Sequence, residues 1–247
     1  MKKILTLVTV LLSSISVSAQ FMNAGSSSSE NSDGWNEVYV QYNIVKNGGY
    51  DKLDKVTKDD VSGTMNGFTV GYNKAFSISQ TTPVYLLVGG AFEYNFKSAD
   101  YSYDYGYSSS YGSYKYRYDY DYSFKAYSIK VPVSITYHYD INEKIAIEPF
   151  AGLNARYYLS AKIDRKYEHY LNGKLRDSKD DTIDPFSSDD TNKNTANHFI
   201  LGGQIGVTAV FNKNITATVS YDTDFSKVHD KLDDKCYRFN FGVGYRF

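Results

Sequence analysis

The chain has 247 residues and is rich in aromatic side chains, with 26 Tyr and 14 Phe, but it contains only four Pro and one Cys. Cys236 has no second cysteine with which to pair, so a small secreted domain held together by disulfides is excluded. The formal net charge of −1 lacks the basic excess that a nucleic-acid partner requires, which excludes that class of function as well.

The first element is a predicted secretory signal peptide over residues 1–19. Lys2 and Lys3 precede an apolar run over residues 4–12, and small residues follow it up to Ala19. This order of charged, apolar and small residues is typical of a cleaved export signal. The apolar run is about half the length that a membrane-spanning helix needs, and no longer apolar run follows it. We therefore predict cleavage after Ala19 and a flexible periplasmic lead-in over residues 20–34.

The rest of the chain, residues 35–247, alternates between apolar and polar side chains. In the last segment, residues 237–247, the odd positions are apolar and the even positions are small or charged. A strand points successive side chains to opposite faces, whereas helical spacing would mix the two sets. The same period recurs upstream, and in one segment the apolar set extends to Ala161. These further predicted strands lie around residues 38–42, 68–72, 84–96, 127–137, 145–161, 199–211 and 215–225.

The connections between these eight strands alternate strictly between short and long. This alternation is expected of a transmembrane β-barrel, which has short periplasmic turns and longer extracellular loops. An even number of strands would leave both chain ends in the periplasm. The predicted fold class is therefore all-β, an eight-stranded antiparallel up-and-down barrel. Its short links are residues 77–83, 140–144 and 212–214, and its long links are residues 47–62, 98–123, 164–197 and 227–235.

The polar face of the predicted strands distinguishes a membrane barrel from a soluble β-sandwich or a lipocalin-like barrel, which would hide its apolar face inside. This face combines charged side chains with many glycines, as a narrow lumen needs. Buried charges are costly unless they are paired, so we expect mutual ion pairs that form a polar plug, with a narrow or gated pore as the alternative. The predicted lumen network is Glu93, Lys130, Glu148, Arg156, Asp222, Asp224, Arg238 and Arg246.

The chain ends in Val243-Gly244-Tyr245-Arg246-Phe247. With this ending, the strand number and the loop alternation, it resembles the small eight-stranded outer-membrane proteins of Gram-negative bacteria, the OmpX, OmpA-barrel and opacity-protein group often labelled porin family. The resemblance implies location in the outer membrane and a C-terminal signal for the barrel-assembly machinery at Phe241, Val243, Tyr245 and Phe247. The Ser18-Ala19-Gln20 region also resembles signal peptides of Bacteroidetes. The family hosts adhesins, lipid-modifying enzymes and proteins of unknown role, so fold alone does not define function.

A tyrosine-rich segment stands out in the second long link. Residues 101–122 hold ten Tyr in 22 positions, mostly spaced by two. These Tyr would share a face if strands three and four extend beyond the membrane, and Tyr offers contact area and a hydroxyl at low entropic cost. One interpretation is a surface that binds a host glycan, protein or matrix; the other is a low-complexity hairpin whose Tyr pair with each other or with lipid headgroups. The binding candidates are Tyr103, Tyr105, Tyr107, Tyr111, Tyr114, Tyr116 and Tyr118.

The third long link gathers carboxylates that could hold Ca²⁺ through oxygen ligands. They are mixed with basic residues and show no EF-hand spacing, so we interpret the link as a solvated loop without a metal. The acidic and basic link 227–235 has the same interpretation. The carboxylates are Asp177, Asp180, Asp181, Asp184, Asp189 and Asp190.

The resemblance leaves catalysis open, since some small barrels of this kind are outer-membrane enzymes. Nucleophilic catalysis needs a base within reach of an activated Ser, and no Gly-x-Ser-x-Gly elbow or His-x-Ser pair occurs. The one candidate is a composite site of His198 with Ser160 or with an acid from a loop, and His138 is interpreted as a satisfied lumen residue. We expect a non-enzymatic monomer without cofactors.

Its predicted partners are outer-membrane lipids and lipopolysaccharide, the barrel-assembly machinery, and a host or matrix ligand at the loops. The predicted role is surface interaction or envelope integrity. A small diffusion channel is the alternative.

Overall fold

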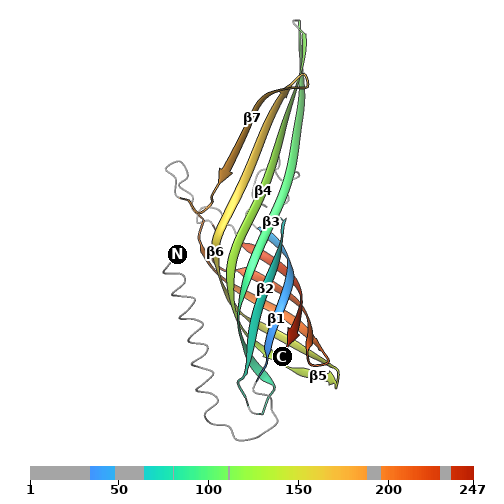
Figure 1. Cartoon of the computed structure of the whole chain (residues 1–247), viewed down its shortest axis with the longest axis vertical. Coiled ribbons are helices and arrows are strands. Elements are labelled where there is room, and N and C mark those ends of the chain that lie inside the picture. Colours follow the sequence, from blue (N-terminus) through green and yellow to red (C-terminus); the bar gives the residue numbers. More distant parts are fainter. Residues whose placement is uncertain (1–33, 48–63, 80, 111, 188–195, 229–234) are drawn as a thin grey trace. The chain divides into compact units, whose positions relative to one another are not determined.

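The computed structural model describes residues 34–47, 64–79, 81–110, 112–187, 196–228 and 235–247, which form one antiparallel sheet (Figure 1). Eight strands of this sheet close into a ring, because the first strand pairs with the last and the two middle strands pair with each other. The predicted eight-stranded barrel is confirmed. Its strands are β1 (Asn36–Asn47), β2 (Thr64–Ser77), β3 (Val84–Ser109), β4 (Gly112–Tyr137), β6 (Ile145–Leu171), β8 (Phe199–Phe211), β9 (Ile215–Asp224) and β10 (Cys236–Arg246).

The apolar positions of the ring face outward. On β10 the predicted register holds, with Val243 60% and Phe247 61% exposed while Arg238 and Asn240 are buried. The same inversion, apolar outside and polar inside, runs round the barrel. Closing the ring leaves no free sheet edge within it, so the backbone polar groups of each strand can pair with a neighbouring strand, as a bilayer interior demands.

The short turns lie where the alternation predicts them. Between β8 and β9 the chain reverses over residues 212–214, where Asn212 and Lys213 adopt positive φ angles of 48° and 68°. The side-chain amide of Asn214 donates to the carbonyl oxygen of Arg246 at 2.9 Å, which ties this turn to the end of β10. The turn after β4 carries a short additional strand, β5 (Tyr139–Asn142), paired with the start of β6.

Two of the long links contain paired strands. Residues 98–123 continue β3 and β4 beyond the ring up to Ser109 and Gly112, the arrangement in which the alternate Tyr share a face. The link 164–197 is also largely strand, since β6 continues to Leu171 and pairs with β7 (Lys174–Ile183). Alternating Tyr and polar residues are themselves a strand pattern, and the segment follows it. We call the four-stranded part beyond the ring the extension (Figure 1): residues 97–109 of β3, 112–125 of β4, 162–171 of β6, and β7.

A β-bulge in β6 separates the barrel from the extension. Tyr127 pairs with Ser160 and Ser128 with Tyr158, so Leu159 has no counterpart on β4. A bulge of one residue exchanges the two faces of a strand beyond it. The prediction that Ala161 faces outward is therefore wrong: Ala161 is 3% exposed and lies inside.

The inverted faces predict how the barrel responds to a charge on its outside. Val219 lies in the middle of β9, points outward, and is paired with Phe241 and Val207. We expect Val219→Arg to lower the free energy of unfolding by about 2–4 kcal/mol, the cost of a cation near the bilayer midplane. Urea titration of the refolded protein in lipid vesicles measures this difference.

The control is Ser108→Arg, which adds the same charge on the extension, where Ser108 is exposed. It should leave the unfolding midpoint unchanged. Equal effects of the two substitutions would mean that Val219 does not face lipid.

Candidate functional site

The centre of the lumen holds one connected set of buried charges. Arg156 on β6 binds Glu93 on β3, with Nε 2.5 Å from Oε2, and its Nη1 lies 3.1 Å from Oδ1 of Asp224 on β9. Arg238 on β10 donates to the same Asp224 oxygen at 2.7 Å. Two guanidinium groups thus share one carboxylate, and charge-assisted hydrogen bonds tie four strands together across the lumen.

Lys130 on β4 closes this set on its other side. Its Nζ lies 3.2 Å from Oδ2 of Asp222 and 3.5 Å from Oε1 of Glu93. The carboxylates also accept hydrogen bonds from uncharged side chains: the hydroxyl of Ser128 donates to Glu93 at 3.0 Å, and the amide of Asn240 donates to Asp222 at 3.1 Å. We call Glu93, Lys130, Arg156, Asp222, Asp224 and Arg238 the central cluster.

A second group, the turn-end cluster, lies near the short turns. Arg246 binds Glu148 through two hydrogen bonds, at 2.8 and 2.7 Å. Nδ1 of His138 lies 2.5 Å from the same carboxylate, and Nε2 lies 3.1 Å from Asp140. The Trp35 ring covers the guanidinium of Arg246 at 3.9 Å, a cation–π contact.

All eight side chains of the predicted lumen network are buried, four acids and four bases, and the structure places them in these two clusters. Sequence reasoning missed one buried acid, Glu37, which is 6% exposed and accepts a hydrogen bond from Thr216 at 2.6 Å. Its position next to the outward-facing Val38 was the available signal, because neighbours on a strand face opposite ways.

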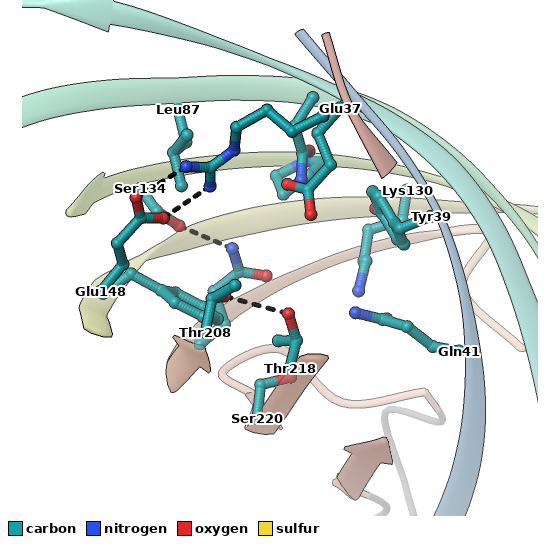
Figure 2. A pocket seen from close by; sticks show the side chains of 15 residues that line it. Glu37, Tyr39, Gln41, Leu87, Lys130, Ser134, Glu148, Thr208, Thr218 and Ser220 are labelled. Atoms are coloured by element: carbon teal, nitrogen blue, oxygen red, sulfur yellow. Dashed lines mark hydrogen bonds and ion pairs between the residues drawn. The ribbon is translucent and has the colours of Figure 1, made fainter. Parts of the chain in front are cut away.

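A small cavity of about 50 Å³ touches both clusters. Figure 2 shows Glu37, Gln41 and Lys130 pointing into it from β1 and β4. Side-chain hydrogen bonds join residues of its lining, including one between Thr208 on β8 and Thr218 on β9 at 2.9 Å. The cavity corresponds to the space of about three or four water molecules.

An apolar layer follows the central cluster toward the extension. The hydroxyl of Tyr158 accepts a hydrogen bond from Arg238 at 3.1 Å, and the Tyr158 ring belongs to this layer. The bulge at Leu159 turns Ala161 inward to join it. The buried members are Ala126, Tyr158, Ala161 and Ile200, with Phe124, Phe186 and Val228 packed against them.

Beyond this layer the lumen-side face of the strands carries tyrosine. Tyr101 to Tyr107 occupy the odd positions of β3, the same side as Glu93 and Asn95 in the barrel. Each lies opposite a Tyr of β4, and the bulge brings Tyr167 and His169 of β6 onto the same face. We call this surface the tyrosine face: Tyr101, Tyr103, Tyr105, Tyr107, Tyr114, Tyr116, Tyr118, Tyr120, Tyr122, Tyr167 and His169. The predicted candidate Tyr111 lies outside the described residues.

The opposite face of the extension carries charges. Arg117 binds Asp119 at 2.8 Å, and the hydroxyl of Ser102 also donates to Asp119 at 2.7 Å. These two hydrogen bonds hold the pKa of the Asp119 carboxyl below its usual value. The hydrogen bond between Lys166 and Glu168 likewise raises the pKa of Lys166. Both pairs are therefore ionised at neutral pH.

His198, the candidate catalytic base, has other partners. Nδ1 of His198 lies 2.8 Å from the backbone oxygen of Tyr158, and its ring stacks on Tyr157 and Phe186. Ser160, its candidate partner, is half-buried and pairs with Tyr127 on β4.

In the described part of the chain no group of three or more His, Cys, Asp or Glu side chains is placed to hold a metal ion. Of the carboxylates considered for Ca²⁺, Asp189 and Asp190 lie outside the described residues. The predicted signal peptide, residues 1–19, and most of the lead-in also lie outside them.

A closed eight-stranded ring with an apolar outside and an ion-paired inside defines a transmembrane β-barrel. The sequence matches the family described as outer membrane protein beta-barrel domain over residues 7–247, and the chain belongs to this family. It is therefore an outer-membrane protein. In such barrels the short turns are periplasmic and the long connections extracellular, which puts the extension outside the cell.

Solved structures with a similar fold include Ail, the attachment invasion locus protein of Yersinia pestis, in complex with the heparin analogue sucrose octasulfate. It is 21% identical, with 87% of this chain and 100% of Ail covered and a TM-score of 0.38. The Neisserial surface protein A is 14% identical, covering 87% and 98%, with a TM-score of 0.40. The outer membrane enzyme PagL is 10% identical, covering 83% and 97%, with a TM-score of 0.36.

These likenesses are too distant to carry an argument about function. No curated protein sequence matches the chain. Among the described residues no helix is long and apolar enough to cross a membrane.

The central cluster predicts a large difference between buried and exposed arginines. Arg156→Met would leave Glu93 and Asp224 short of a cation inside the lumen, so we expect the free energy of unfolding to fall by about 3–5 kcal/mol. Urea titration in vesicles measures the loss.

Arg117→Met is the matched control, because Arg117 also binds a carboxylate but is exposed to solvent. It should leave the midpoint unchanged. If Arg156→Met were equally harmless, the central cluster would not stabilise the barrel.

Proposed function

We propose that this outer-membrane protein is a non-enzymatic surface-binding protein, in which a closed barrel anchors the extension and the tyrosine face binds the ligand. The observation that carries the proposal is a change along a single strand face. In the barrel this face holds paired charges, then the apolar layer, and beyond them exposed tyrosines. The same strand face therefore closes the lumen inside the barrel and forms an exposed surface on the extension.

The chemistry of the tyrosine face supports binding. Tyr103, Tyr105 and Tyr107 are 51%, 41% and 59% exposed although their rings are large. Exposed aromatic patches of this kind mark interaction sites, and Tyr contributes contact area and a hydrogen-bonding hydroxyl at low entropic cost. The face rests on paired strands, so little ordering is needed when a ligand binds.

The lumen supports a closed barrel over the alternative of a diffusion channel. The central cluster joins β3, β4, β6, β9 and β10 across the interior, and the apolar layer lies next to it. An ion entering this region would have to break charge-assisted bonds between groups held in a low-dielectric environment.

We further propose the biogenesis that the sequence predicts. Export would use residues 1–19 as a cleaved signal, and the barrel-assembly machinery would read Phe241, Val243, Tyr245 and Phe247. Phe241, Val243 and Tyr245 point outward on β10, and Phe247 directly after it is 61% exposed, so a partner can reach all four. The folded barrel would then act as a monomer among lipids and lipopolysaccharide.

Removing the outer part of the β3–β4 hairpin tests the proposed binding function. Tyr101 and Tyr120 are cross-strand partners, so residues 102–119 can be replaced by an Asn-Gly turn that closes the shortened hairpin. Vesicles carrying this variant should bind at least ~10-fold less to ligands found on arrays of glycans and matrix proteins, since most of the tyrosine face is lost.

A double variant, Ser102→Ala with Ser108→Ala, changes only the opposite face and is the control; it should bind like the parent protein. The barrel of both variants should keep its unfolding midpoint in urea. Undiminished binding by a folded, shortened barrel would contradict the proposal.

Conductance tests the closed lumen. The purified barrel in a planar bilayer should show no steady single-channel current, because the central cluster and the apolar layer fill the lumen. A reproducible current from the parent protein would favour the diffusion channel instead. Release of acyl chains from labelled lipopolysaccharide, measured in parallel, would contradict the non-enzymatic role.

A further inference from the structure

Two rings of the tyrosine face, Tyr116 and Tyr118, are its inner rings, and they turn their edges and hydroxyls toward the solvent. Tyr116 and Tyr118 on β4 lie between Tyr105 on β3 and His169 on β6, with ring centroids 4.6 to 6.0 Å apart and planes within 8° of parallel. Each inner ring is therefore covered on both flat sides. Because side chains stand roughly perpendicular to a sheet, the exposed part of each inner ring is its hydroxyl-bearing edge.

The outer row on β3 is different. Tyr105 is stacked on β4 rings from one side only, and Tyr103 and Tyr107 are each more than half exposed. Alternate residues of a strand lie about 6.6 Å apart, so the three rings form a row along β3. The tyrosine face thus combines a row of open aromatic surfaces with an adjoining field of phenolic hydroxyls.

This part of the tyrosine face carries no net charge. Within the described positions 101–107 of β3 and 114–122 of β4, the residues on this face are all Tyr. A hydrogen bond with Tyr118 raises the pKa of Tyr105 above its ordinary value, so this hydroxyl stays protonated at neutral pH. The charged side chains of these two segments, such as Asp104 and Arg117, lie on the opposite face.

We infer that the tyrosine face binds a neutral glycan presented from outside the cell. The inference rests on the proposed binding function and names its ligand. Sugar rings have C–H faces that pack on open aromatic rings, and they carry hydroxyls that exchange hydrogen bonds with phenols. The β3 row supplies the ring surfaces, and the inner rings supply the hydroxyls.

The observations favour this ligand over the other classes. A sulfated or phosphorylated chain calls for an excess of cations, which this face does not offer. Its β3 and β4 segments have none, Arg165 of β6 is paired with Asp181 at 2.6 Å, and Lys179 of β7 lies between Asp177 and Asp181. An acyl chain would leave the row of hydroxyls without hydrogen-bonding partners. A protein partner would bring its own mixture of charges, and these would find their complement on the opposite face, where Arg117 and Asp119 lie.

The test is a glycan array that contains neutral hexose and N-acetylhexosamine oligosaccharides together with their sulfated and sialylated counterparts, alongside matrix proteins. The full-length protein in nanodiscs should bind neutral glycans, and its affinity for them should change less than about 2-fold between 50 and 300 mM NaCl, since no ion pair is involved.

Substitutions in the row of tyrosines on β3 test whether the glycan binds to this face. Tyr103→Ala and Tyr105→Ala should each weaken neutral-glycan binding about 3- to 10-fold, because each removes one ring surface. Tyr103→Phe keeps the ring and should lose less than Tyr103→Ala. Asp104→Ala changes the opposite face between the two tyrosines and should bind like the parent. Urea midpoints show that each variant is folded.

The outcomes separate this inference from the proposed function. Binding only to charged glycans or only to matrix proteins, abolished by the shortened hairpin, would overturn the neutral-glycan inference and leave the binding function standing. The absence of any bound glycan on the array would also overturn it. Neutral-glycan binding that survives Tyr103→Ala and Tyr105→Ala would move the site away from the tyrosine face.

Discussion

The pairing of charges inside a narrow barrel is the constraint on which the rest of this structure depends. A bilayer interior requires a closed ring of strands, and alternation then sends every second side chain of each strand into the lumen. In this chain that set includes Glu93, Arg156 and Asp224, whose side chains are at most 2% exposed and therefore out of contact with bulk water. Their mutual ion pairs offset the cost of burial and join strands that are far apart in the sequence, such as β3 and β9.

The same constraint explains how the surface region is supported. β3, β4 and β6 line the lumen for about half of their length and then continue into the extension. The extension is therefore held by backbone pairing that begins in the membrane. A free loop of similar length would lose conformational entropy when it binds a ligand. A paired sheet has already lost that entropy during folding. Presenting tyrosines on rigid strands is therefore a way to obtain binding area at a low entropic cost.

How far the sequence can predict such a molecule depends on the range of the interaction. Alternation is local, and it was sufficient to place Arg238 and Arg246 inside and Val243 outside. The partners of these side chains were not predictable, because the stagger between strands decides which residues face one another across the lumen. Four acids and four bases allow many pairings, and only the three-dimensional register brings Arg246 to Glu148 rather than to Glu93.

The bulge at Leu159 shows a second limit. One extra residue reversed the faces of β6, so Ala161 and His169 lie on the side opposite to the one that simple alternation assigns. The compositional signal for a bulge is weak, since Leu159 suits the outward face as well as its neighbours do. The pairing of β6 with β7 was missed for a different reason: Asp, Ser and Lys are common in loops, and the mixed charges of the link 164–197 favoured a solvated loop.

An exposed sheet of this kind also has to avoid pairing with other chains. A free edge invites strand addition, and charged side chains on an edge strand oppose it. β7 follows that rule, with Lys174, Arg176 and Lys179 along its length, all of them exposed. The tyrosine face is protected by different means, because its rings are stacked on one another and turn hydroxyls toward water. A surface built in this way stays hydrated when it is empty, yet it keeps the open rings of β3 available to a ligand that supplies both C–H surface and hydroxyls.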